Sequence, residues 1–387
     1  MTEHKNQHYV PRFYLRNFSS DGVGLIKLDV DSLKISRRNI DRLCSSFYFY
    51  SSEERRKGFE YATSRLEDVQ AGILRKIITD KSFQALSFED RFYLNILVLL
   101  MRTRTRASKI DSERLANALF DSLKPYLIQT EEARKRGLTG EILDSVKLIK
   151  KGANHEGMLL ALNGAELIAD LNICLLMNAT IRPFITSDNP VVLHNQMVHK
   201  DFGCLGFQSP GLIIILPLTQ RLALLLYDPV VNSLYPAGAS IVHLNNKKDV
   251  DEINRLNIVG ADSSIIVDSH DDSEYAKSLV QGVLSFRGRE KYEVTAESHI
   301  VRGEEHELLH YHSVGPHYRA RLSFLSVNSR ASRTIGKVLE SQKGRPVSLV
   351  RNARIVEIVD KRMDDLFAKM KALKHDSTSL GQTSHDM

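Results

Sequence analysis

The sequence predicts an α+β fold in which a helical body packs on a mostly antiparallel sheet and a basic extension follows. From about residue 53 to 178, apolar residues recur at three- and four-residue steps, which is typical of amphipathic helices. From 179 to 285, short apolar runs are separated by Pro and Gly, as expected between strands. Beyond 286 the chain is richer in Arg, Ser and His.

These changes divide the chain into three predicted parts. An α+β domain is expected over residues 1–285, helical from 50 to 178 and strand-rich from 179 to 285. A basic extension should follow over 286–375, and a polar tail over 376–387. With 387 residues, of which 42% are hydrophobic, the chain is long enough to bury a large core.

The composition favours a protein of the cytoplasm. The longest apolar stretches, such as 212–218, are far shorter than the ~18 residues that cross a bilayer. The first residues lack the apolar core of a secretory signal peptide. The three cysteines, Cys44, Cys174 and Cys204, are odd in number and widely spaced, so we expect neither a disulfide framework nor a thiolate zinc site.

The N-terminal elements are predicted from turn and alternation signals. Pro11 stands as in the first turn of a helix, so a short helix or turn should follow it. The runs 25–31 and 33–40 alternate in part and predict a hairpin. The apolar spacing then predicts a long amphipathic helix over 53–80.

Helices and then strands follow. Ser87 and Asp90 resemble a capping box, which predicts the start of a buried helix. Further helices are expected over 111–124, 130–150 and 156–178. Strands are expected over 179–186, 191–194, 211–218, 221–228 and 262–269. Two more helices are expected over 245–260 and 273–285.

Two short motifs contain the residues best suited to chemistry. His8 precedes a proline-initiated turn that would hold its imidazole in a fixed direction, as acid/base catalysis or metal ligation requires. A structural role, in which His8 caps this turn, explains it as well. Asp188 and Asn189 follow a predicted strand and precede Pro190, so their side chains should project from a strand end. An Asx turn is the structural alternative for this pair.

These motifs resemble those of a bacterial family, the domain of unknown function 4238. Residues 8–12 (HYVPR) are similar to its N-terminal HYVPQ-type motif, and residues 187–190 (SDNP) to its central motif. The resemblance covers roughly residues 7–285, with Arg12 where the family usually has Gln and Arg104 where Pro often occurs. The family has no settled function. By association with other orphan bacterial families, the resemblance implies a stress or anti-phage effector.

Gathered in one pocket, the matched residues would suit a hydrolase acting on nucleic-acid or nucleotide phosphodiesters. His8 would be a base or a metal ligand, and Glu67 and Asp188 would bind Mg²⁺, Mn²⁺ or Zn²⁺ or act as acid/base partners. Arg102 and Asn189 would contact the phosphate and stabilise its developing charge. Alternatively, Glu60, Glu67 and Arg102 form an internal ion-pair network that ties the helices together.

A second hypothesis is a zinc-dependent peptidase. Residues 306–310 (HELLH) match the helical H-E-x-x-H pattern, in which two His side chains one turn apart bind zinc and the Glu activates water. His306 and His310 would then be the metal ligands. Gly303 and the Gly-Pro pair at 315–316 do not favour a long helix here, so a solvated His/Glu helix explains the pattern as well.

A third hypothesis is a non-enzymatic nucleic-acid-binding or assembly module. Residues 319–354 contain nine basic residues and one acidic residue, although the net charge of the whole chain is only +6. Clustered basic charge of this kind binds phosphates and releases counterions, whereas a solvated charged face is the structural alternative. The predicted contacts are Arg319, Arg321, Arg330, Arg333, Lys337, Lys343 and Arg345.

Overall fold

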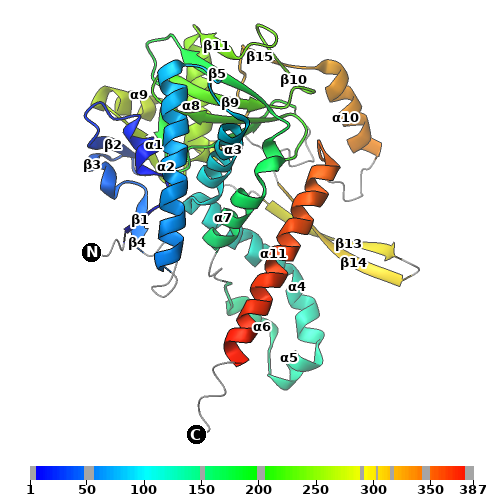
Figure 1. Cartoon of the computed structure of the whole chain (residues 1–387). Coiled ribbons are helices and arrows are strands. Elements are labelled where there is room, and N and C mark those ends of the chain that lie inside the picture. The colour runs from blue at the N-terminus through cyan, green and yellow to red at the C-terminus, as the bar shows by residue number, and fades with distance from the viewer. Residues whose placement is uncertain are drawn as a thin grey trace.

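The computed structural model confirms the α+β class (Figure 1). It describes residues 6–47, 56–148, 153–197, 205–287, 292–301, 304–313, 318–341 and 349–379. Helices pack against two main sheets, whose strand pairs are antiparallel except for one. No helix within these ranges is long and apolar enough to cross a membrane.

The larger sheet has five strands in the order β11-β5-β9-β8-β7. They are β5 (Asn172–Asn178), β7 (Val192–Asn195), β8 (Leu212–Pro217), β9 (Leu222–Tyr227) and β11 (Ile241–Leu244). Every residue of β8 and β9 is buried because both faces of the sheet are covered. Alternate side chains therefore enter two different hydrophobic cores, as Ile214 and Ile215 do.

The smaller sheet has four strands in the order β3-β2-β12-β6. The predicted hairpin is confirmed as β2 (Gly24–Asp29) paired with β3 (Ile35–Asn39). Strand β12 (Ser264–Val267) pairs with both β2 and the short β6 (Thr186–Ser187). Helices α8 (Lys247–Gly260) and α9 (His270–Val280) enclose a third core against this sheet.

The helical body covers the first core. Helix α3 (Phe88–Thr103) begins at Ser87, where the predicted capping box with Asp90 is formed. It packs between the elongated α2 (Arg56–Asp80) and α7 (Ala153–Asn163), and its side chains meet the larger sheet. The remaining helices of this part are α1 (Arg12–Arg16), α4 (Arg106–Gln129), α5 (Glu131–Lys135) and α6 (Gly140–Ser145).

Three sequence-based element predictions are wrong. The helix expected over 156–178 ends at Asn163, and Asn172–Asn178 forms β5, which lies between β9 and β11. This run is apolar on all sides, and periodicity alone does not distinguish a buried helix from a buried strand. The helix expected over 130–150 is two short helices, and of the strand expected over 179–186 only Thr186 lies in a strand, the two-residue β6.

Part of the predicted C-terminal extension packs on the first 285 residues. Strand β15 (Leu325–Val327) pairs with β10 (Asn232–Leu234), and Ala320, Leu322 and Phe324 enter the second core. Two helices follow, α10 (Ser329–Ser341) and α11 (Ala353–Ser379), whereas β13 (Tyr292–Val301) and β14 (Glu304–Ser313) form a hairpin. Most of the predicted polar tail lies outside the described residues, and the domain boundary at 285 stays a prediction.

Candidate functional site

The two motifs meet where the N-terminal segment, the turn between α3 and α4, and the loop after β6 come together. We name this region the motif junction and define it by residues 8–11, 104–105 and 187–190. Tyr14 of α1 joins the N-terminal segment to β6 and β8 beside this region, because its fully buried hydroxyl donates to the Pro217 carbonyl at 2.7 Å and bonds Thr186 Oγ1 at 2.8 Å. The chain thus joins residues that are far apart in sequence.

Asp188 is the most enclosed charged group of the motif junction, with 1% of the residue exposed. Its Oδ1 accepts a hydrogen bond from the Asp262 amide at 2.9 Å. Its Oδ2 accepts from the Ser263 amide at 2.9 Å and from Ser263 Oγ at 3.0 Å. Burial raises the pKa of Asp188, and the Ser263 donors oppose this shift. Both carboxylate oxygens therefore hold the loop before β12.

Asn189 connects two helix ends. Its Nδ2 donates to the carbonyl of Gly260, the last residue of α8, at 2.7 Å. Its Oδ1 accepts from Thr105 Oγ1 at 3.2 Å, and Thr105 is the N-cap of α4. Asn189 and Thr105 are both buried. Like Asp188, Asn189 therefore positions structural elements and is not exposed to a substrate.

Glu67 forms its ion pair with Arg104 and not with Arg102. Arg104 Nη1 lies 2.9 Å from Glu67 Oε1, and Arg104 Nε donates to the Tyr9 carbonyl at 3.2 Å. Arg102 is half-buried and forms no ion pair with any residue in the described part of the chain. Arg104 is the C-cap of α3, so a helical wheel does not give its direction. In the sequence, Arg104 stood out only as a departure from the family pattern, which often has Pro at this position.

His8 lies in the short strand β1 (Asn6–His8), which pairs with β4 (Ser45–Phe47). Its Nε2 is 3.3 Å from the Ile40 carbonyl, the partner of a neutral imidazole that donates through this nitrogen. Burial lowers the pKa of His8, whereas Glu67 and Asp41 act to raise it. The charge of Glu67 thus acts on His8, and because the pKa of His8 lies below its ordinary value of 6.5, the imidazole is mainly neutral near pH 7.

The motif junction does not fit a metal ion through its described groups. Mg²⁺, Mn²⁺ and Zn²⁺ would need several His, Cys, Asp or Glu side chains aimed at one point. No group of three or more such side chains that could hold a metal occurs among the residues that the structure describes. The oxygens of Asp188 already accept hydrogen bonds from protein donors.

The helical prediction for His306 and His310 is wrong. Both residues lie in β14, opposite His299 and Thr295 of β13. In a helix, residues four apart are displaced by about 6 Å along the axis, whereas in a strand the displacement is ~13 Å. The strand therefore does not form the one-turn zinc arrangement on which the peptidase hypothesis depends. Ten-residue pairing with β13 outweighs the weak local signal for a helix.

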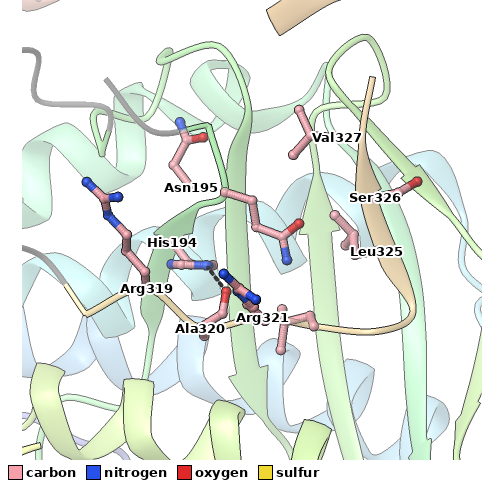
Figure 2. A pocket seen from close by; sticks show the side chains of 10 residues that line it. His194, Asn195, Arg319, Ala320, Arg321, Leu325, Ser326 and Val327 are labelled. Carbon is pink, nitrogen blue, oxygen red and sulfur yellow. Dashed lines mark hydrogen bonds between the residues drawn. The ribbon is translucent and has the colours of Figure 1, made fainter. Parts of the chain in front are cut away.

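A hollow of about 540 Å³ lies between the sheet edge at β7 and the segment that leads into β15 (Figure 2). Two of the predicted nucleic-acid contacts, Arg319 and Arg321, line it. His194 of β7 lines the hollow as well, and its Nε2 lies 3.1 Å from the Ala320 carbonyl.

The other predicted basic contacts follow on α10. Arg330, Arg333 and Lys337 are exposed, and their spacing of three and four residues places them on one side of this helix. Lys343 and Arg345 lie outside the described residues. We name the exposed side chains Arg319, Arg321, Arg330, Arg333 and Lys337 the C-terminal basic surface.

Comparison with known proteins gives a family and no function. Neither the curated proteins nor the solved structures contain a significant match to the chain. Residues 6–271, which include every residue of the motif junction, match the model of one family, described as a protein of unknown function (DUF4238). The chain therefore belongs to this family of unknown function.

Proposed function

We propose that this protein binds nucleic acid through its C-terminal basic surface. The observation that supports this proposal is that five cationic side chains are exposed and form no ion pair with another described residue. Arg333 bonds only a backbone carbonyl of its own helix, that of Ser329. Cations that the protein itself does not neutralise are available to phosphates.

The arginines used by the fold differ clearly from these five. Arg351 donates to both oxygens of Asp170 at 3.0 and 2.9 Å and also to the carbonyls of Leu167, Phe207 and Ser209. Arg351 lies in the same basic stretch of the sequence, yet it attaches the C-terminal segment to the core. Charge count alone therefore overestimates the number of free cations in this stretch, and the proposal rests on the exposed ones.

The arrangement of the basic surface suits an extended polyanion. Arg330 and Lys337 are separated by ~10 Å along α10, at 1.5 Å per residue. Ala331, Ile335 and Val338 lie on the opposite side of this helix and are only half-exposed. The cations therefore form a row on the outer side, along which successive phosphates could bind.

Salt-dependent binding tests the proposal. Fluorescence anisotropy of a labelled oligonucleotide, measured between about 50 and 200 mM salt, should show affinity that falls steeply with salt. Replacing Arg330, Arg333 and Lys337 together by Gln should reduce the log–log slope by about 2 to 3, because each lost phosphate contact contributes ~0.7–0.9. Arg134→Gln, an exposed arginine of the distant α5, is the matched control. Wild-type binding that is absent, or unchanged in the triple variant, would overturn the proposal.

Hydrolysis of bound nucleic acid is a second candidate, supported by the environment of His8. A neutral imidazole beside the Glu67–Arg104 pair could accept a proton from an attacking water. Glu67 is the accessible member of that pair, with 34% of its side chain exposed, against 3% for Arg104. The stress or anti-phage role stays a prediction based on the family resemblance alone.

Turnover assays test this second candidate. The full chain is incubated with RNA, plasmid DNA and nucleotides in the presence of Mg²⁺, Mn²⁺ or Zn²⁺, beside His8→Ala and Glu67→Gln variants. The candidate requires product formation that both substitutions reduce about 100-fold or more, the usual contribution of a general base. Activity that survives in both variants would place the chemistry elsewhere.

A further inference from the structure

We infer that the hollow beside β7 binds a single nucleotide unit, with its phosphate at Arg319 and Arg321 and its base against Leu325 and Val327. The inference rests on the proposed nucleic-acid binding, and it names the substrate class as single-stranded nucleic acid or a free nucleotide. Duplex DNA or RNA keeps its bases stacked and paired, so it does not present one to a hollow.

Residues 319–324 form the first wall of the hollow, and they alternate between exposed and buried. Ala320, Leu322 and Phe324 are buried in the second core, so Arg319 and Arg321 emerge together on the opposite, exposed side. Residues two apart in an extended chain are separated by ~7 Å. Two guanidinium groups at this spacing can bind one phosphate from two directions, and arginine forms bidentate contacts to phosphate oxygens.

The second wall is the edge strand β7 with the residue that follows it. His194 is buried and joins the walls through the Ala320 carbonyl at 3.1 Å. With its amide oriented to satisfy both partners, Gln196 donates to the Leu325 carbonyl and accepts from the Leu322 amide, each at 3.3 Å. These bonds fix the two walls relative to each other before a ligand arrives, which reduces the entropy lost on binding.

The lining changes in character from one end of the hollow to the other. Figure 2 shows Arg319 at one side and Arg321 near the centre, with Leu325 and Val327 at the other side. Leu325 belongs to the second core and reaches the hollow with only 5% of the residue exposed, whereas Val327 is half-exposed. Neither arginine forms an ion pair with a residue of the described chain. An anionic group is therefore favoured at one end and a flat, largely apolar group at the other, as in a nucleotide.

Size and position support a nucleotide further. The volume of about 540 Å³ lies within the range of roughly 300–1,000 Å³ typical of small-ligand sites. Helix α10 begins at Ser329, directly beyond Val327 at the rim, so its row of cations starts where the hollow ends. A strand with one nucleotide in the hollow could continue along Arg330 and Arg333.

Calorimetric titration of the full chain with AMP, adenosine and inorganic phosphate tests the inference. AMP should bind at least about tenfold more tightly than adenosine, the effect expected from charge-assisted hydrogen bonds to the phosphate. Arg321→Gln should weaken AMP binding by about the same factor, whereas Arg134→Gln should not change it. Val327→Asn should weaken binding of AMP and leave that of inorganic phosphate unchanged.

The outcomes separate this inference from the proposed function. Salt-dependent oligonucleotide binding without any AMP binding would overturn the nucleotide site and leave the basic surface in place. AMP binding without oligonucleotide binding would support the site and contradict the proposed function. Arg319→Gln provides a second variant, since both arginines are exposed and their loss should leave the fold unchanged. AMP binding that is equal in wild type and in both arginine variants would also overturn the inference.

Discussion

The motif junction and the C-terminal basic surface use charge in opposite ways. In the junction, Arg104, Asp188 and Asn189 are at most 3% exposed, and each bonds a named partner from another part of the chain. On the basic surface, the five cations are exposed and have no acidic partner among the described residues. The first arrangement holds the fold together, whereas the second is available to an external anion.

The same difference separates the part of the chain that matches the family from the exposed cations that we propose to bind nucleic acid. The family match ends at residue 271, and all five cations of the basic surface lie beyond it. The recognisable motifs lie inside the match and join α4, α8 and the smaller sheet. We therefore interpret the motifs mainly as determinants of the fold, because buried polar groups are retained only where each finds a partner.

The strongest test of this comparison is Asp188→Ala. Removing the carboxylate leaves the amides of Asp262 and Ser263 without their acceptor, and a buried unsatisfied donor costs about 1–3 kcal/mol. We expect a loss of about 3 kcal/mol in the free energy of unfolding, measured by urea denaturation. Asp188→Asn, which keeps one acceptor oxygen, should lose less. A fully stable Asp188→Ala protein would contradict a structural role for the motif.

Arg351→Ala tests whether a cation of the same basic stretch belongs to the fold. Its side chain is 6% exposed, and its removal takes the donors away from Asp170 and the Phe207 carbonyl. The carbonyls of Leu167 and Ser209 keep donors from Gln208 and the Leu212 amide. Because Asp170 is partly exposed, we expect a loss of about 2 kcal/mol, below the 3–5 kcal/mol of fully buried pairs. The melting temperature and urea midpoint measure it, and nucleic-acid affinity should not change. If the variant is stable but binds nucleic acid more weakly, Arg351 is a nucleic-acid contact and not a structural residue.

The pH dependence of stability tests the environment of His8. Its pKa in the folded protein lies below its ordinary value of 6.5, so the unfolded chain binds more protons as the pH falls through that value. Stability is therefore fully present above pH 6.5 and declines below it. His8→Gln, which keeps a donor for the Ile40 carbonyl, should flatten this decline in urea denaturation between about pH 5 and 7.5. An unchanged profile would contradict the buried, neutral imidazole.

The smallest expected effect on stability is that of Arg333→Gln. An exposed side chain without an ion-pair partner in the described chain should change the free energy of unfolding by less than about 0.5 kcal/mol. The log–log slope of oligonucleotide affinity against salt should nevertheless decrease by ~0.7–0.9, the contribution of one phosphate contact. A stability loss comparable to that of Arg351→Ala would remove the distinction between the two kinds of arginine.

Local signals predicted much of the fold and part of the candidate site. The capping box at Ser87, the hairpin of β2 and β3, and the apolar strands β8 and β9 follow from periodicity and turn chemistry within about ten residues. The family resemblance singled out His8 and Glu67, but it did not give the positions of their side chains relative to each other. Strand β5 was missed because its neighbours β9 and β11 come later in the chain, and only their pairing decides its conformation.

The sequence by itself determined the α+β class, the family and the basic character of the C-terminal segment, since composition, periodicity and motifs are properties of the chain. Only the tertiary structure decided which charges remain available. It paired Glu67 with Arg104 and enclosed Asp188. It also buried Arg351 against Asp170 and left Arg319 and Arg321 exposed. The physical reason is that a charge acts through its partner and its exposure, and both depend on segments that lie far apart in sequence.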